Sequence, residues 1–200
     1  MGNETVPVFF ACDDNFVKYT MVAITSLKAN ASRDRKYDIH ILCIKITDVM
    51  KKKCLELSDD TFRITFDDVT DYMKAISYKM PIRDYYSKTT YYRLFIAEMF
   101  PQYDKAIYID SDLVVKGDIS EMYDIDITGS YVGATFEQVM QVDIFAEYTE
   151  KALGIPRDDY FNAGVLLINC VMWRENKVLD QFIKLLHEFT FVVAQDQDYL

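Results

Sequence analysis

The chain has 200 residues, of which 50% are hydrophobic and 27% are charged, and its formal net charge is −10. This length and composition predict one folded domain with a sizeable core. The excess of acidic residues, without a long basic block, argues against binding to nucleic acid or to an anionic membrane surface. No stretch approaches the roughly 18 apolar residues of a membrane span and the N-terminus lacks a signal peptide, so we expect a cytoplasmic protein.

The first half of the chain alternates strand patterns with helix patterns. Apolar runs predict strands at 6–12, 37–44 and 62–66. Apolar residues at three-and-four spacing predict helices at 16–29 and 47–57. Strands separated by helices indicate a layered α/β fold with a mostly parallel sheet. The irregular stretch 70–88, which contains Pro81, predicts a loop or short helices.

The second half of the chain continues this alternation less regularly. Further strands are predicted at 105–110, 131–136 and 160–169, with a short extended piece at 113–115. Helices are predicted at 89–99, ended by Pro101, at 119–123, at 138–153, closed by Gly154 and Pro156, and at 171–189.

The cysteines and histidines favour structural roles. Cys12, Cys43, Cys54 and Cys170 show no Cys-x-x-Cys spacing and stand mostly in apolar surroundings. They are typical of reduced core thiols rather than of disulfides or a zinc site. His40 lies in a strand pattern and His187 on an amphipathic helix, and neither has a ligand-like neighbour in the sequence.

A pair of carboxylates, Asp110 and Asp112, directly follows the apolar strand pattern at 105–110. The triplet Asp-x-Asp also occurs at 124/126 and 196/198, and chance alone explains matches in a chain this rich in Asp. Only the first pair stands at the carboxyl end of a predicted buried strand, where open α/β sheets bind ligands. Asp carboxylates suit Mn²⁺ or Mg²⁺, which complete their coordination with water and phosphate oxygens.

Two further polar features have alternative interpretations. Asp13 to Asn15 follows the first strand as a nucleotide-binding turn would, but the same residues suit a structural turn and helix cap. Arg93 lies among aromatic residues and is able to pair with a phosphate or a carboxylate, or to cover apolar surface as an exposed side chain.

Five motifs follow one another along nearly the whole chain: FACDDN at 10–15, SKTTYYRL at 87–94, YIDSDLVV at 108–115, YFNAGVLLIN at 160–169 followed by Trp173 and Arg174, and QDQD at 195–198. Together they resemble the ordered motifs of glycosyltransferase family 8, which includes bacterial lipopolysaccharide galactosyl- and glucosyltransferases and glycogenin. Five motifs in one order are far more specific than any one of them.

The resemblance implies a GT-A fold, a nucleotide-diphospho-sugar transferase architecture, and retaining transfer of glucose or galactose from a UDP-sugar. The acceptor would be a glycan or lipid-linked glycan in lipopolysaccharide or surface polysaccharide synthesis, and Mn²⁺ or Mg²⁺ would serve as the cofactor. The implied metal ligands are Asp110 and Asp112. The implied substrate-binding residues are Ala11, Asp13, Asn15, Arg93, Asp112, Asn162, Ala163, Asp196 and Gln197, and of these Asp196 and Gln197 are the implied catalytic residues.

The chain departs from the family pattern at its C-terminus. Family members usually carry a later segment whose His completes the metal site and whose Lys meets the diphosphate, and the sequence ends before it. We therefore expect residues 1–200 to be a single GT-A catalytic domain truncated at its C-terminus. A missing C-terminal part leaves room for peripheral association with a membrane.

Two alternatives stay open at this point. A haloacid-dehalogenase-like phosphatase also places Asp-x-Asp after a strand and uses Mg²⁺. It usually has Thr two positions beyond the second Asp, where this chain has Val114. A non-catalytic UDP-sugar-binding domain would bind UDP with a metal and show no turnover.

Overall fold

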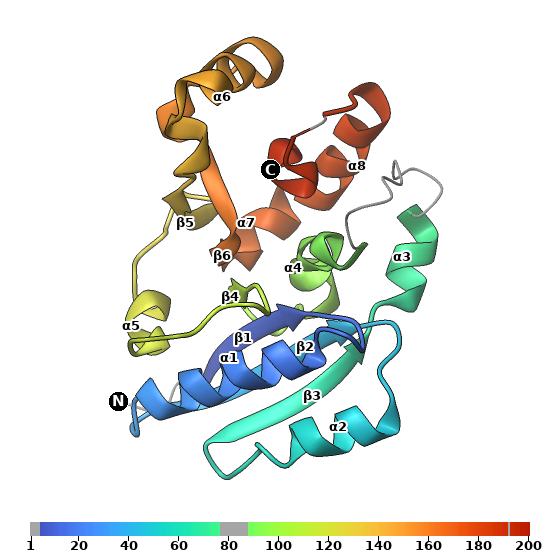
Figure 1. The fold of residues 1–200 in the computed structure, drawn as a ribbon, viewed down its shortest axis with the longest axis vertical. Coiled ribbons are helices and arrows are strands. Elements are labelled where there is room, and N and C mark those ends of the chain that lie inside the picture. Colours follow the sequence, from blue (N-terminus) through green and yellow to red (C-terminus); the bar gives the residue numbers. More distant parts are fainter. Residues whose placement is uncertain (1–4, 77–87, 192) are drawn as a thin grey trace.

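The computed structural model describes residues 5–76, 88–191 and 193–200. Its centre is a six-stranded sheet with the strand order β3-β2-β1-β4-β6-β5 (Figure 1). The strands are β1 (Thr5–Ala11), β2 (Lys36–Cys43), β3 (Phe62–Asp68), β4 (Lys105–Ile109), β5 (Val132–Phe136) and β6 (Phe161–Asn169). Each lies within two residues of a predicted strand, because runs of β-branched and aromatic residues mark buried strands clearly.

The directions of the strands determine which chain segments meet at the edge of the sheet. β1 is parallel to β2 and β4, and β2 is parallel to β3, whereas β6 is antiparallel to both β4 and β5. The predicted mostly parallel sheet is therefore confirmed, with β6 as the reversed strand. Because β6 is reversed, its amino end lies beside the carboxyl ends of β4 and β5.

Helices cover both faces of this sheet. The α-helices are α1 (Val17–Asn30), α2 (Asp48–Leu55), α3 (Thr70–Ile76), α4 (Ile96–Met99), α5 (Ile119–Tyr123), α6 (Asp143–Tyr148), α7 (Cys170–Glu175) and α8 (Val178–Glu188). The 3-10 segments are η1 (Lys88–Phe95), η2 (Val139–Gln141), η4 (Arg157–Asp159) and η5 (Gln195–Tyr199), and η3 (Thr149–Leu153) is a π-helical turn. Among the described residues, none of the helices combines the length and the apolar composition needed to cross a bilayer.

Successive residues of the central strands pack into two separate hydrophobic layers, as the period of two in a strand requires. Phe9 and Tyr108 belong to a layer with the apolar residues of η1, α4, α7 and α8. Phe10 and Ile107 belong to the opposite layer, which includes the buried faces of α1 and α5. Figure 1 shows α1 and α2 running along the part of the sheet formed by β1, β2 and β3. A strand buried on both faces reads as a continuous apolar run, which explains the sequence pattern.

Several predicted segments differ from the structure. The single helix predicted at 171–189 is two helices, because Lys177 takes a left-handed backbone conformation with φ of 51° between α7 and α8. The helix predicted at 89–99 is 3-10 in η1 and α-helical only in α4, consistent with the β-branched and aromatic residues of η1. The helix predicted at 138–153 divides into η2, α6 and η3, and the extended piece predicted at 113–115 is not a strand.

The stretch 70–88, predicted as a loop or short helices, begins with helix α3. Residues 77–87 of this stretch, including Pro81 and the first residue of the SKTTYYRL motif, lie outside the described residues. Gly154 ends η3 with a left-handed backbone at φ of 74°, which confirms its predicted role as a helix stop.

Candidate active site

The predicted site residues gather at one edge of the sheet, where β1, β4 and β5 end and β6 begins. Asp110 follows β4, and its backbone N–H donates to the carbonyl of Gly164 in β6 at 2.8 Å. Asn162 and Ala163 lie near the amino end of β6, next to Gly164. The prediction that the acidic pair stands at the carboxyl end of a buried strand is therefore confirmed.

Arg93 is the centre of the candidate site. It is only 3% exposed, so the alternative of an exposed arginine that covers apolar surface is wrong. Its guanidinium donates through Nη1 to the carbonyl of Ala163 and through Nη2 to Oδ1 of Asp110 at 3.2 Å. The guanidinium carbon also lies 4.4 Å from the ring centroid of Tyr108, within the range of a cation–π contact. One cation thus holds β4 and β6 together at the site.

The second carboxylate beside Arg93 is Asp196 of η5, which is 4% exposed. Its Oδ2 lies 3.1 Å from Nε of Arg93, yet that Nε–H donates to the carbonyl of Thr90 at 2.8 Å. Oδ2 therefore forms an ion pair but receives no hydrogen bond from the described residues. Burial is the largest cause that raises the pKa of Asp196 to about 6; the Asp110 charge adds to the rise, and Arg93 opposes it.

The two oxygens of the Asp110 carboxylate have different surroundings. Oδ1 accepts a hydrogen bond from the Tyr108 hydroxyl at 2.8 Å as well as the one from Arg93. Oδ2 lies over Gly164, where an added Cβ would come within 2.7 Å of it, and it receives no hydrogen bond from the residues that the structure describes. Burial raises the pKa of this carboxyl and Asp112 adds to the rise, while Arg93 and Tyr108 lower it.

These features fit a divalent cation held by Asp110 and Asp112. The Asp110 carboxylate is partly exposed and one of its oxygens lacks a donor from the described residues, so it gains from a nearby cation, and the side chain of Asp112 is exposed two residues further along. Within the described ranges, no group of three or more His, Cys, Asp or Glu side chains forms a complete metal site. Mg²⁺ and Mn²⁺ accept one or two carboxylates when water and phosphate oxygens supply the other ligands, so two carboxylates are enough.

Gln197 and Asn162 are oriented by the same neighbouring groups. Oε1 of Gln197 accepts a hydrogen bond from the backbone N–H of Ala163 at 2.7 Å, which links η5 to β6. Nδ2 of Asn162 donates to Oε2 of Glu137 at 2.7 Å, and Nε2 of Gln197 approaches the same oxygen at 3.4 Å. The structure therefore brings Arg93, Asn162, Ala163, Asp196 and Gln197 into one connected network with Asp110.

The residues after β1 form a separate part of the same edge. The carbonyl of Ala11 accepts a hydrogen bond from the Ser111 hydroxyl at 3.0 Å, which joins the end of β1 to the Asp-x-Asp triplet. Oδ1 of Asp13 accepts hydrogen bonds from the backbone N–H groups of Asn15 and Phe16 at 2.9 and 3.0 Å, just before α1. Asp13 thus has the turn-forming role that the sequence offered as an alternative, and Asn15 is exposed beside it.

The other two Asp-x-Asp triplets have local structural partners. Asp124 forms an ion pair with Arg35 at 2.6 Å, and Asp126 accepts from the backbone of Thr128 at 2.8 Å. Asp198 accepts hydrogen bonds from the hydroxyls of Tyr148 and Tyr160 at 2.8 and 2.6 Å.

The structural roles predicted for the cysteines and for His40 agree with the structure. The four cysteines are free and buried, and burial raises the pKa of the Cys12 and Cys54 thiols to about 11 and those of Cys43 and Cys170 to about 12. His40 is buried and its ring nitrogens contact Asp67 and Tyr103, each at 3.0 Å. His187 lies exposed on α8.

The sequence analysis missed three residues of this network: Tyr108, Glu137 and Gly164. Tyr108 precedes Asp110 by two residues and so shares its face of the strand. Glu137 directly follows the strand predicted at 131–136. The rule that ligands bind at the carboxyl ends of strands, which pointed to Asp110, therefore applies to Glu137 as well. The close approach of Asp110 to Gly164 depends on the antiparallel pairing of β4 with β6, which the sequence pattern does not reveal.

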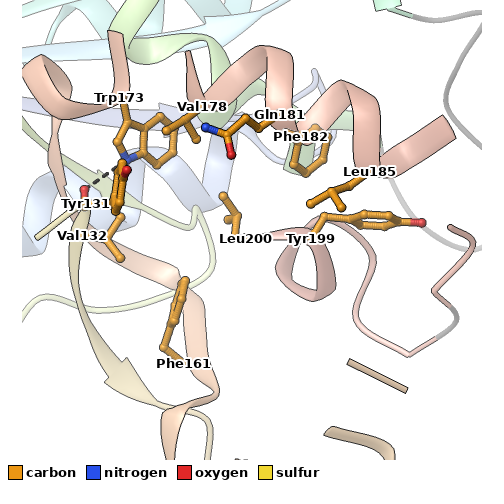
Figure 2. Close-up of a pocket in the computed structure, with 10 residues that line it drawn as sticks. All are labelled: Tyr131, Val132, Phe161, Trp173, Val178, Gln181, Phe182, Leu185, Tyr199 and Leu200. Carbon is orange, nitrogen blue, oxygen red and sulfur yellow. Dashed lines mark hydrogen bonds between the residues drawn. The ribbon is translucent and has the colours of Figure 1, made fainter. Parts of the chain in front are cut away.

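A pocket of about 230 Å³ lies apart from this network, between the β5–β6 end of the sheet, α8 and η5 (Figure 2). Its lining is mostly apolar and includes Trp173, whose indole N–H donates to the carbonyl of Tyr131 at 3.0 Å. None of the predicted substrate-binding or metal-binding residues lines it. Charged ligands require charged or polar partners, so this pocket is unsuited to a nucleotide.

Comparison with known proteins agrees with the order of motifs. The sequence model of glycosyl transferase family 8 matches residues 7–200. The chain is 30% identical over 99% of its length to a Haemophilus influenzae protein named "Putative glycosyltransferase", of which it covers 59%. It is 26% identical over 92% of its length to lipopolysaccharide 1,2-glucosyltransferase of Escherichia coli K12, of which it covers 53%.

Solved structures show the same fold. The chain superposes with a TM-score of 0.81 on the galactosyltransferase LgtC, solved with donor and acceptor sugar analogs, at 26% identity over 97% of the chain and 69% of LgtC. The TM-score is 0.86 for the bifunctional glycosyltransferase WbbM, at 28% identity over 98% of the chain and 37% of WbbM. The expected GT-A fold is therefore confirmed.

The chain spans between half and two thirds of the length of the first two relatives described above. Its family match nevertheless covers all but its first six residues. Because this match covers nearly the whole chain, it excludes the phosphatase alternative, which belongs to a different fold family. The chain belongs to glycosyltransferase family 8.

Proposed function

We propose that this chain carries the donor site of a retaining hexosyltransferase that moves glucose or galactose from a UDP-sugar to a glycan or lipid-linked glycan acceptor. The observation that carries the proposal is the network around Arg93. It joins Asp110, Ala163 and Asp196 at the sheet edge where α/β folds bind nucleotides. The names of the relatives, which include lipopolysaccharide glucosyltransferases, support a role in lipopolysaccharide or surface polysaccharide synthesis.

The chain's own residues would bind the donor in two parts. Ala11, Asp13 and Asn15, at the end of β1, would contact the uridine and ribose. Asn162, Ala163, Asp196 and Gln197 would form the hexose side of the site, and Arg93 would fix the positions of Ala163 and Asp196. Asp110 and Asp112 would hold Mn²⁺ or Mg²⁺, which when bound neutralises charge on the leaving diphosphate.

The transfer would break the bond between the anomeric carbon and the phosphate oxygen of UDP and form a bond from that carbon to an acceptor hydroxyl oxygen. The hydroxyl proton would pass to the departing phosphate, on the same face of the sugar. Covalent attack by Gln197 is disfavoured because it is a neutral amide engaged by Ala163 and Glu137. Asp196 is disfavoured because it is buried against Arg93.

The donor site is tested by calorimetric titration of UDP, UDP-glucose and UDP-galactose with and without Mn²⁺. The variants are Asp110→Asn/Asp112→Asn and, as a matched control, Asp124→Asn/Asp126→Asn, since the second pair is an Asp-x-Asp triplet with local structural partners. We expect metal-dependent UDP binding in the wild type and in the control, and its loss in the first variant. Equal binding by all three proteins would contradict the proposed site.

Catalysis is tested separately, by release of UDP and by the anomeric configuration of the product in NMR spectra. Retained configuration with turnover supports the proposal. Metal-dependent UDP binding without any turnover, in the presence of glycan acceptors, would instead identify a non-catalytic UDP-sugar-binding domain.

A further inference from the structure

Glu137 holds the side-chain amides of two predicted sugar-facing residues. It directly follows β5 and is half-buried. Its Oε2 accepts a hydrogen bond from Nδ2 of Asn162 at 2.7 Å and a longer one from Nε2 of Gln197 at 3.4 Å. Its Oε1 accepts from the backbone N–H of Val139 at 3.1 Å. Both oxygens of this carboxylate are therefore engaged, in contrast to those of Asp110.

The position of Glu137 is itself fixed by the fold. Its backbone N–H donates to the carbonyl of Tyr160 at 3.0 Å, one residue before β6 begins. The pairing of β5 with β6 shifts register between Ala134 and Thr135, and Thr135 then stands opposite Asn162. Such an irregularity redirects the side chains that follow it. The carboxylate thereby reaches both β6 and η5 from the end of β5.

The hydrogen bonds leave each amide only one satisfactory orientation. The oxygen of Gln197 faces the backbone N–H of Ala163 at 2.7 Å, and the oxygen of Asn162 faces the backbone N–H of Gly164 at 2.8 Å. A backbone N–H only donates and an ionised carboxylate only accepts. Rotating either amide by 180° would bring its NH2 group against a backbone N–H and its oxygen against the carboxylate. Glu137 therefore keeps the amide nitrogens of Asn162 and Gln197 directed toward its own carboxylate.

The Glu137 network also reaches the acidic pair. Oδ1 of Asn162 would lie 2.9 Å from a Cβ added at Gly164, and Oδ2 of Asp110 would lie 2.7 Å from that same point. These two oxygens therefore share the space over Gly164. The Asp110 carboxylate keeps its own hydrogen bonds from Arg93 and Tyr108, so its position does not depend on Asn162.

We propose that Glu137 is a positioning residue for the transfer step, which holds Gln197 and Asn162 in the orientations that face the donor hexose. This inference rests on the proposed hexosyltransferase function. Glu137 makes no contact with the nucleotide in this proposal, so replacing Glu137 is expected to lower turnover and to leave the affinity for UDP unchanged. A shift of about 1 Å in a positioning group lowers turnover by roughly 100-fold.

The test compares Glu137→Ala and Glu137→Gln with Glu147→Ala, an exposed glutamate of α6 whose contact is an ion pair with Lys151. For each protein we would measure the kcat of UDP release from the better donor sugar, the Kd of UDP with Mn²⁺, and the melting temperature. We expect a kcat lower by roughly 100-fold in Glu137→Ala with an unchanged Kd. Glu137→Gln keeps one acceptor oxygen, so its loss is expected to be nearer tenfold, and it remains informative if Glu137→Ala fails to fold. Glu147→Ala is expected to match the wild type.

A combined variant separates positioning from a general structural effect. If Glu137 acts through Gln197 and Asn162, adding Glu137→Ala to the Gln197→Ala/Asn162→Ala variant loses little further kcat. Losses that multiply, or a wild-type kcat in Glu137→Ala, would overturn the inference while leaving the proposed function intact. A wild-type protein that binds UDP yet turns over no donor would overturn the proposed function and the positioning role with it.

Discussion

The molecule contains two polar networks on the same face of its sheet, centred on the buried side chains of His40 and Arg93, and they differ in how completely their groups are paired. Around His40, the ring nitrogens contact Asp67 and Tyr103 at 3.0 Å each, and the Tyr103 hydroxyl donates to Asp38 at 2.8 Å. Arg63 completes this network with two hydrogen bonds to Asp38 at 2.8 and 2.6 Å. Every one of these groups has a partner, so the network needs no ligand.

Around Arg93 the pairing is incomplete. Oδ2 of Asp196 is buried and receives no hydrogen bond from the described residues. Oδ2 of Asp110 receives none from them either, although its side chain is 37% exposed, and both carboxylates adjoin the buried guanidinium. Buried polar atoms are nearly always hydrogen-bonded in folded proteins, and exceptions call for a functional explanation. Burial and charge alone therefore do not identify a functional site, since both networks contain buried, charged groups. Incomplete pairing at the sheet edge distinguishes the second network.

The largest effect is expected when the central cation of the incomplete network is removed. Arg93→Met leaves Asp196 and Asp110 without their shared positive partner, and breaking a buried pair in this way costs roughly 3–5 kcal/mol. The melting temperature at pH 7 should then fall by on the order of 10 °C for a chain of this size. Thermal unfolding followed by circular dichroism checks this. A fall of only one or two degrees would mean that the guanidinium does not stabilise the network.

A smaller, pH-dependent effect is expected from Asp196. Burial raises its pKa from 3.8 to about 6, so between these values the folded state keeps a proton that the unfolded state releases. The free energy of unfolding therefore falls as pH rises from 4 through 6, by at most roughly 3 kcal/mol, and is level above about pH 7. Asp196→Asn removes this titration.

The measurement is urea unfolding of the wild type and Asp196→Asn at pH 4, 5, 6 and 7. The difference in free energy of unfolding between the two proteins should shift in favour of the variant from pH 4 to pH 6, with a smaller further shift to pH 7. A difference that is the same at all four values would show that Asp196 titrates normally.

Much of this arrangement follows from local sequence patterns. The strands were predicted within two residues because their apolar runs are bounded by polar residues, as at Asp110 after β4. The location of the acidic pair followed from the general rule for parallel strands. The break at Lys177 was not predicted, since neither Gly nor Pro marks it and the helical spacing continues across it.

Local sequence patterns did not predict the side-chain contacts that complete the site. The burial of Arg93 depends on carboxylates from β4 and η5, which are 17 and 103 residues away along the chain. The contact of Glu137 with Asn162 depends on the register shift between β5 and β6. Side-chain contacts between distant segments require the strand order and register, which a single sequence does not provide.

Gly164→Ala tests whether the free oxygen of Asp110 needs the space above β6. The new Cβ would lie 2.7 Å from Oδ2 of Asp110 and 2.9 Å from Oδ1 of Asn162, so the carboxylate must move. We expect about a 100-fold loss of kcat, together with weaker metal-dependent UDP binding in calorimetry. Overpacking of this kind also lowers stability by roughly 1–3 kcal/mol.

The matched control for this variant is Gly117→Ala. No heavy atom lies within 4 Å of the Cβ that would be added at Gly117, and its φ is not positive. This variant should keep wild-type activity and gain up to about 1 kcal/mol of stability from the lower entropy of its unfolded state. Equal behaviour of the two glycine variants would argue against a role for the space above Gly164.

The smallest effect is expected in the fully paired network, from His40→Phe. Phenylalanine preserves the stacking on Phe9, whose ring centroid lies 4.7 Å from that of His40, but removes the hydrogen bonds to Asp67 and Tyr103. We expect a loss of roughly 1–2 kcal/mol in the free energy of unfolding, measured by urea titration. UDP affinity with Mn²⁺ should be unchanged at temperatures where the variant is folded, because a network with every group paired contributes to stability alone. Weaker UDP binding in this variant would show that the two networks are coupled through the sheet and that complete pairing does not separate structural from functional groups.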